Sequence, residues 1–198
     1  TGAVTVSDTE GTITATTLTD ITAQTNGTVT AAAAGITISG NTTQLTAALV
    51  TEETKAVVAN GAVSISDTGN VAATVLSGIG ATTGGVVTAA NALTITGTTE
   101  EITNALVTES SLVVASNGSA AVTFVGDNPT GAQLAAINPK VSGTITLADV
   151  TQVFTGTAAQ MQAAFSGGLA GTQTGAVTVS DTEGTITATT LTDITAQT

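Results

Sequence analysis

The stretch TGAVTVSDTEGTITATTLTDITAQT occupies residues 1–25, and the same letters recur without one change at residues 174–198. The two copies define a period of 173 residues. Within the first copy, Val4-Thr5-Val6 alternates as a half-buried strand does, and Ser7-Asp8-Thr9-Glu10 suits the N-cap of a helix. A chain that ends by restating its own beginning indicates a repeat architecture.

Weaker similarities divide the period into shorter units. ITISGNTTQLTAALV (36–50) resembles LTITGTTEEITNALV (93–107), and VTVSDT (4–9) resembles VSISDT (63–68). The apolar position that opens each unit falls at Val4, Ile36, Val63, Leu93, Val122, Gln152 and Val177. The period therefore holds six units of about 29 residues, in two alternating kinds. A regular step of this length predicts a solenoid.

Each unit has the same internal order. A short alternating strand precedes a Ser, Thr, Asp or Asn cluster, such as Thr98-Thr99-Glu100-Glu101, which suits a helix N-cap. The helix that follows carries one apolar stripe, formed by pairs four residues apart. These pairs are Leu45 and Leu49, Ile102 and Leu106, and Met161 and Phe165. A second strand closes the unit, at 27–30, 85–88 and 143–146.

The fold expected from this order is α/β: a parallel-stranded solenoid of about 29-residue strand–helix–strand units. We expect residues 1–198 to form one continuous solenoid, with 1–173 as one six-unit period and 174–198 as the first unit of the next. Stacked strands lie about 4.8 Å apart, whereas packed helices need about 8–10 Å. We therefore expect short helices that alternate between opposite sides of a straight array, which rises about 29 Å per period.

Composition excludes several classes of function. The net charge is −12, with only Lys55 and Lys140 on the positive side, so the chain lacks the basic cluster that binds nucleic acid or anionic membranes. No run of about 18 apolar residues is present to span a bilayer. The acidic, Thr-rich composition suits a secreted protein at an extracellular bacterial surface.

Two short motifs resemble those of catalytic or nucleotide-binding sites. Asp67-Thr68-Gly69 has the letters of an aspartic-protease loop, but the corresponding positions read Asp8-Thr9-Glu10 and Asp181-Thr182-Glu183. A helix-capping aspartate explains all three better than a pair of carboxylates that share a proton. Gly78-Ile79-Gly80, with Gly84, follows a helix rather than a strand, so we interpret these glycines as turn residues and not as a nucleotide loop.

The chain has no His and no Cys, which argues against zinc or iron sites. Calcium stays open, because carboxylates suit it, although the EF-hand and nonapeptide patterns are missing. The aspartates near expected turns are Asp8, Asp20, Asp67, Asp127, Asp149, Asp181 and Asp193. We predict no catalytic, cofactor-binding or metal-binding residues, no cofactor other than this open calcium, and no enzymatic activity.

The central polar position of the first strand carries a hydroxyl in most units. These positions are Thr5, Thr37, Ser64, Thr94, Thr123, Val153 and Thr178. In a solenoid they would form one rank, similar to the flat Thr ranks of β-solenoid ice-binding proteins. Ordinary strand alternation explains them too, and a helix layer over that face would exclude ice. Glycosylation sequons begin at Asn26, Asn41 and Asn117.

VTVSDT, LTITGT, ALVTESSLVVAS and GTITLADVTQVFTGTAAQM resemble tandem repeats of giant cell-surface and secreted proteins of cyanobacteria. That group includes the very large surface proteins linked to swimming in marine unicellular cyanobacteria. The resemblance covers essentially the whole chain. It implies an extracellular, high-copy, non-enzymatic array and brings no catalytic residues with it.

We therefore expect a structural segment of an extracellular fibre, sheath or surface layer, which elongates by end-to-end stacking of units. The expected partner is the protein itself, with no nucleic acid, no membrane insertion and no small-molecule substrate. The alternatives are a rigid spacer, or stalk, of a large bacterial adhesin and, less favoured, a Thr-rank ice-binding surface.

Overall fold

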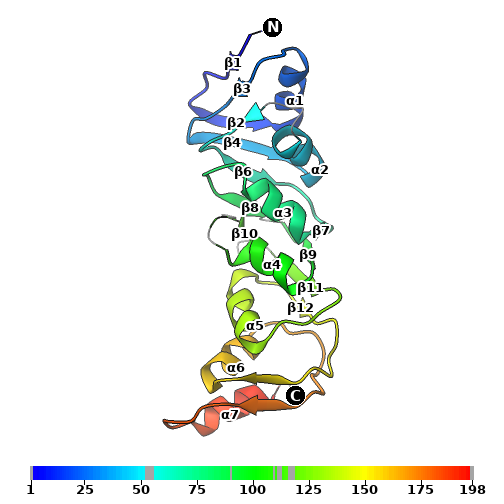
Figure 1. Ribbon diagram of the computed structural model, residues 1–198, viewed down its shortest axis with the longest axis vertical. Coiled ribbons are helices and arrows are strands. Elements are labelled where there is room, and N and C mark those ends of the chain that lie inside the picture. The colour runs from blue at the N-terminus through cyan, green and yellow to red at the C-terminus, as the bar shows by residue number, and fades with distance from the viewer. Residues whose placement is uncertain are drawn as a thin grey trace.

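A computed structural model describes residues 2–51, 56–89, 91–108, 110, 113–115 and 119–196. Over these ranges the fold is α/β, with short parallel strands and short helices in regular succession. Figure 1 shows an elongated molecule in which successive parts of the chain follow one another from the N-terminal to the C-terminal end. Lys55 and Asn117 lie outside the described residues.

Helices recur at regular intervals along the described chain. They are α1 (Ala15–Ala23), α2 (Thr42–Leu45) continued by the π-helical turn η1 (Thr46–Val50), α3 (Ala73–Gly80), α4 (Thr99–Leu106), α5 (Gly131–Ile137) continued by the 3-10 turn η4 (Asn138–Lys140), α6 (Ala158–Phe165) and α7 (Ala188–Thr195). The starts of consecutive α-helices are 27, 31, 26, 32, 27 and 30 residues apart. Short and long steps alternate, which matches the two kinds of unit in the sequence.

We number the units 1 to 7 by the α-helix that each contains. Their described residues are 2–23, 24–51, 56–81, 82–89 with 91–108, 113–115 with 119–140, 141–165 and 166–196.

Parallel sheets connect each unit to the next. The first sheet holds β1 (Val4–Thr5), β3 (Val29–Thr30) and β5 (Ala56–Val57); the second holds β2 (Glu10–Thr14), β4 (Gly35–Gly40), β6 (Ala62–Ile65), β8 (Val87–Ala89) and β10 (Val113–Val114). The third holds β7 (Asn70–Ala72), β9 (Thr94–Gly97), β11 (Ala121–Phe124) and β12 (Ile145–Thr146), and the fourth holds β13 (Phe154–Gly156) and β14 (Val177–Val179). Every strand pair in the described residues is parallel. The parallel α/β part of the prediction is therefore confirmed.

The sheets replace one another along the molecule. β4 leads directly into α2, yet its neighbour β6 is followed by a further strand, β7, before α3 begins. β6 then pairs with β8, which is the first strand of unit 4. A position in the second sheet thus moves from just before the helix to the start of the unit. Successive units are therefore offset sideways as well as stacked.

The prediction that helices alternate between opposite sides was wrong. Each helix from α1 to α7 contacts the next one along the chain, and Figure 1 shows a single row that passes from the right at α1 and α2 to the left at α5 and α6. The sideways offset meets the spacing requirement in another way. A shift of about 7 Å with a rise of about 4.8 Å separates helix axes by about 8.5 Å, which is enough for packing.

The Ser7-Asp8-Thr9-Glu10 cluster does not cap the helix of its own unit. α1 begins at Ala15, and the hydroxyl of its N-cap residue Thr14 accepts a hydrogen bond from the Thr17 N–H at 3.1 Å. The strand β2 intervenes between the cluster and the helix. The prediction of a local cap at this cluster was therefore wrong.

The single rank of hydroxyls is not formed either. Thr37 lies opposite Ala62, while Ser64 lies opposite Ser39, two positions away from the expected register. Thr5 belongs to a different sheet from Thr37. The offset between units moves equivalent sequence positions out of line, so the ice-binding alternative loses its continuous flat rank.

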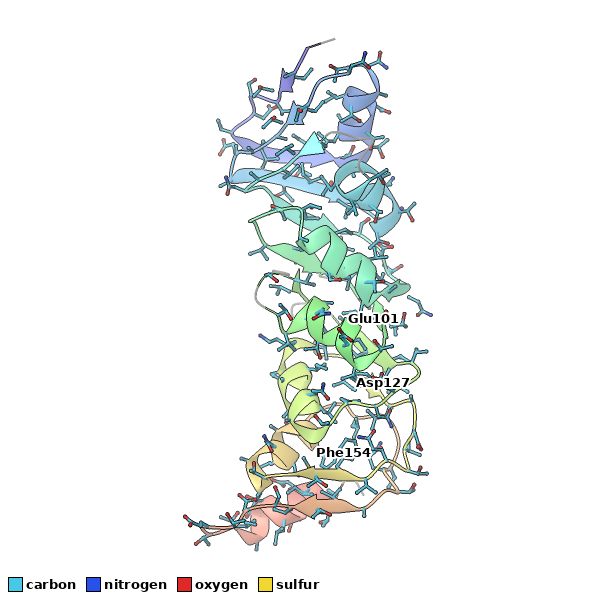
Figure 2. The ribbon with its side chains drawn as sticks, in the orientation of Figure 1. Glu101, Asp127 and Phe154 are labelled. Carbon is cyan, nitrogen blue, oxygen red and sulfur yellow. The ribbon has the colours of Figure 1, made fainter. Side chains whose placement is uncertain are left out.

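A thin apolar core runs the length of the described chain. Ile36 and Ile38 of β4 are fully buried, as the period-2 pattern requires. The apolar helix pairs are all buried, which confirms the expected inward stripe. Two of the three phenylalanines lie in unit 6, where the rings of Phe154 and Phe165 meet edge to face with centroids 5.4 Å apart. Figure 2 labels Phe154 in this lower part of the molecule.

This pair generates a prediction about stability. Phe154→Ala should lower the free energy of unfolding of unit 6 by about 3–5 kcal/mol, because it removes a fully buried ring and leaves a cavity. Phe154→Leu should cost clearly less, since it keeps most of the volume. Native-state hydrogen exchange of α6 amides measures both losses locally, and equal protection in the two variants would contradict the assignment.

Candidate functional site

The polar side chains of the described residues gather at the contacts between units. The described chain has no group of three or more acidic, His or Cys side chains that could hold a metal ion. A surface depression of about 330 Å³ between units 5 and 6 is lined by small and amide side chains, such as Ala135, Asn138 and Ser142, and by no charged one. The unit-to-unit contacts are therefore the candidate functional site.

Aspartates reach from one unit to the helix of the preceding unit. Asp67 accepts from the Thr42 N–H at 2.6 Å and from the Thr42 hydroxyl at 3.0 Å. Asp127 accepts from the Thr99 N–H at 2.8 Å. These N–H groups belong to the first turns of α2 and α4, which lack partners inside the helix and favour negative charge. The carboxylate therefore ties two units together at the end of a helix.

Asp181 repeats the contact at α6, where it accepts from the Ala158 N–H at 2.6 Å. The donors of this set lie on the helices of units 2, 4 and 6, and the aspartates lie on units 3, 5 and 7. The prediction that Asp67 and Asp181 cap helix N-termini is confirmed. Their partner, however, is the helix of the neighbouring unit.

The same helices also carry capping boxes of their own. Thr98 accepts from the Glu101 N–H at 3.3 Å, and Glu101 accepts from the Thr98 N–H at 2.8 Å. Figure 2 shows Glu101 on α4 and Asp127 in the unit below it, on the same side of the molecule. Asn41 with Gln44 and Thr157 with Gln160 form equivalent boxes on α2 and α6. Even-numbered helices thus begin with donors satisfied both locally and by the next unit.

A threonine and a glycine make a second recurring contact. The Thr25 hydroxyl donates to the Gly2 carbonyl at 2.5 Å and accepts from the Gly27 N–H at 3.0 Å. The Thr83 hydroxyl bonds the Gly61 carbonyl and the Gly85 N–H in the same way, at 2.5 and 3.0 Å.

The glycines of this contact permit close approach of two backbones. A Cβ at Gly27 would overlap the backbone of Gly2, and a Cβ at Gly85 would overlap the carbonyl of Gly61. Only the hydrogen atom of a glycine fits between these two backbone segments. The neighbouring unit therefore requires glycine at positions 27 and 85.

Amide side chains bridge units 5 and 6. Asn128 donates to the Asp149 carbonyl at 2.6 Å and accepts from the Ala148 N–H at 2.7 Å. The Thr151 hydroxyl and N–H both donate to the Asp149 carboxylate and hold the pKa of Asp149 below its usual value. Asn138 donates to the Ala163 carbonyl of α6 at 2.8 Å. These hydrogen bonds join the loops of units 5 and 6.

The motifs that suggested chemistry have structural roles. Asp67 faces Thr42, and the corresponding Asp8 and Asp181 lie in units 1 and 7, far along the stack (Figure 1), so no pair of these carboxylates is formed. Gly78 and Gly80 lie in the last turn of α3. The turn prediction for these two glycines was wrong, because Leu76 and Ile79 beside them anchor the helix in the core.

The aspartates considered for calcium are dispersed in the same way. Asp193 accepts from the Gln162 side chain at 2.8 Å, and Asp149 binds Thr151. Asp8 and Asp20 make no hydrogen bond within the described part of the chain. For Asp67, Asp127 and Asp181 the sequence gives no signal for the partner, which lies 23 to 28 residues away at a helix N-terminus.

Comparison of the chain with protein-family models, with curated proteins and with solved structures finds no match. Among the described helices, none is both long enough and apolar enough to cross a membrane.

Two glycine substitutions test the close approach of neighbouring units. Gly85→Ala should destabilise the protein by more than about 1 kcal/mol, because its Cβ would displace the backbone of unit 3. Gly78→Ala is the matched control; its Cβ meets nothing within 4 Å in α3, and it should stabilise by about 0.5–1 kcal/mol. Thermal and urea denaturation followed by circular dichroism measure both, and effects of the same sign would contradict this account.

A second pair of substitutions tests the Asp127 carboxylate, which joins units 4 and 5. Asp127→Ala should cost about 0.5–1 kcal/mol, since it leaves the Thr99 N–H without its charged acceptor at the start of α4. Asp8→Ala removes the same charge from a side chain without a partner in the described residues and should change stability little. Hydrogen exchange at the first turn of α4 localises the loss, and unchanged exchange there would refute the contact.

Proposed function

We propose that this chain is a segment of a solenoid with a structural function, in a fibre, sheath or surface layer that lengthens by stacking of units. One observation carries the proposal. The residues that repeat the beginning of the chain form α7 and β14, and β14 extends the parallel stack of β13 in unit 6. The repeat thus adds a unit to the same array rather than forming a separate body.

The helices of the two copies support this proposal. Thr14 accepts from the Thr17 N–H at 3.1 Å in α1, and Thr187 accepts from the Thr190 N–H at 3.1 Å in α7. The hydroxyls of Thr19 and Thr192 bond the carbonyl four residues earlier at 3.0 and 2.9 Å. Equal sequences form equal helices, so a longer array with this period could repeat its geometry indefinitely.

The mechanism is physical. Strand edges, helix N-termini and close glycine contacts in each unit are satisfied by the adjacent unit, so a unit is completed only by another one. The net charge of −12 opposes side-by-side aggregation, while the ends of the stack present hydrogen-bonding groups and apolar side chains. Growth along the axis is therefore favoured over clumping.

We place this array outside the cell, as a non-enzymatic surface component with itself as partner. The acidic, Thr-rich composition and the resemblance to cyanobacterial surface repeats support that location. Calcium is not needed for the contacts described above, which use carboxylates as acceptors for N–H groups.

The adhesin spacer is the second candidate, and the elongated stack favours it equally. The two differ in what a longer chain would carry: further units in a fibre, or a distinct binding module in an adhesin. Sequencing of the gene that encodes this chain separates them. Ice binding has no observation in its favour once the hydroxyls fall out of line.

Assembly at high protein concentration tests the fibre. We expect filaments with a strand spacing of about 4.8 Å and a length increment of about 51 Å for each six-unit period, because neighbouring helix axes lie about 8.5 Å apart. Electron microscopy and fibre diffraction measure both spacings. Spherical oligomers, or filaments with strands along the fibre axis, would contradict the proposal.

A further inference from the structure

Two strand connections cross most junctions of the stack, but only one crosses the junction between units 5 and 6. Among the described strands, β1–β3 and β2–β4 join units 1 and 2, β3–β5 and β4–β6 join units 2 and 3, β6–β8 and β7–β9 join units 3 and 4, and β8–β10 and β9–β11 join units 4 and 5. Units 6 and 7 are joined by β13–β14 and by a bridge between Ile145 and Leu169. Units 5 and 6 share only β11–β12, which is two residue pairs long. The sheet connection is therefore weakest there.

A proline removes the second connection at this junction. β2 and β7 run directly into α1 and α3, and they pair with the next unit through Ile13 and Val71, which lie opposite Ile38 and Ile95. Pro129 stands at the same place, two residues before α5. Proline has no N–H to donate and is excluded from the interior of a sheet. Its segment forms no strand, so among the described strands β13 pairs only with β14.

Side-chain amides replace the missing ladder. The Gln152 side chain donates to the Pro129 carbonyl at 2.7 Å. Asn128 donates to the Asp149 carbonyl at 2.6 Å and accepts from the Ala148 N–H at 2.7 Å, and both of these hydrogen bonds are exposed to solvent. Water competes for such bonds and each side chain can rotate away, so they open more readily than a main-chain ladder does.

The junction is loosely filled on the side of these amides. A surface depression of about 520 Å³ lies there, lined by Gly126, Asp127, Asn128, Ala148, Asp149 and Gln152. Val125, which follows β11, and Val153, which precedes β13, are 55 % and 61 % exposed. Little packed apolar surface would be separated if the two units moved apart on this side.

The helix side of the same junction is tightly packed. α5 and α6 contact each other (Figure 1), and Met161 of α6 is fully buried. A Cβ at Gly131 or at Gly156 would overlap the Met161 side chain, so this side chain fills the space beside both glycines. The Asn138 side chain adds a hydrogen bond to the Ala163 carbonyl at 2.8 Å. A junction that is tight on one side and loose on the other can rotate about the tight side.

We propose that the junction between units 5 and 6 is a hinge of the stack. The contact of α5 with α6 is its pivot, and the side-chain amides of Asn128 and Gln152 form a latch that opens and re-forms. The consequence for a fibre rests on the proposed structural function. An array with the 173-residue period then has one bending point in each period, between stiffer blocks of units.

Spin labels on pairs of introduced cysteines measure this motion in the full chain, which has no cysteine of its own. Val125→Cys with Ala159→Cys spans units 5 and 6, and Ser66→Cys with Glu100→Cys spans the corresponding positions of units 3 and 4; all four side chains are exposed. We expect double electron–electron resonance to give a broader distance distribution across units 5 and 6 than across units 3 and 4. Equal widths would overturn the hinge.

A restored ladder should stiffen the junction. Pro129→Val with Gln152→Leu introduces the residue types that units 3 and 4 carry at these places, Val71 and Leu93. We expect the Thr155 amide to gain hydrogen-exchange protection, and the distribution across units 5 and 6 to narrow to the width found across units 3 and 4. A protected Thr155 amide with an unchanged width would overturn the proposal, because the missing ladder would then not be the cause of the motion.

The converse variant decides the case in which the Thr155 amide stays unprotected. Val71→Pro should remove the second ladder between units 3 and 4 and broaden the distribution of the label pair at positions 66 and 100. Val71→Ala, which keeps the N–H, is the matched control and should leave that width unchanged. An unchanged width in folded Val71→Pro protein would overturn the hinge. If Val71→Pro does not fold, the comparison of the two label pairs without further substitutions is decisive.

Failure of the structural function itself has a different signature. It would appear as compact particles, without an elongated profile, in small-angle X-ray scattering of the unmodified protein. An elongated profile together with equal widths at the two junctions would reject only the hinge.

Discussion

The difference between two packing distances governs this molecule. Parallel strands stack about 4.8 Å apart, but helices on the same units need about 8–10 Å. A straight column cannot satisfy both when each unit contributes one strand and one helix. The chain meets the two distances by shifting each unit sideways, and this shift accounts for the succession of sheets. β6 shows it most clearly, because it joins the pre-helical strand β4 to the opening strand β8.

The same shift explains why units come in two kinds. Displacement brings the loops that follow β6, β11 and β14 against the N-terminal turn of the helix in the preceding unit. Asp67, Asp127 and Asp181 occupy that position and bind α2, α4 and α6. The helices that receive a carboxylate also hold capping boxes. Among the odd-numbered helices, α5 holds a box of Thr130 and Gln133 without such a carboxylate, and α3, whose N-cap residue is Ala72, has no side-chain cap. Capping is therefore distributed between neighbours, and the natural structural element is a pair of units.

Sequence reasoning succeeded where information lies inside one unit. The i, i+4 spacing of Ile102 and Leu106 defines a helix and its buried face, and the capping box at Thr98 marks where it starts. Prediction from the sequence failed for features that depend on contacts between units. Neither the offset of Ser64 against Ser39 nor the partner of Asp67 can be read from local periodicity. A two-residue change of register preserves every local pattern, so hydroxyl ranks and helix sides depend on packing that only the whole stack determines.

The repeated segment separates what sequence dictates from what position dictates. α1 and α7 share their residues, their caps and their internal hydrogen bonds, yet Leu18 is buried and Leu191 is exposed. The helix is a property of the repeated residues, whereas burial depends on the neighbouring unit, and so does the strand β2, which has no counterpart at residues 183–187. Each Å² of apolar surface removed from water stabilises by about 25 cal/mol. A unit at the end of the stack buries apolar surface on one face only, whereas an internal unit buries it on two. The ends of such a stack are therefore its least stable part and its most reactive one, since the same missing contacts favour both fraying and the arrival of another unit.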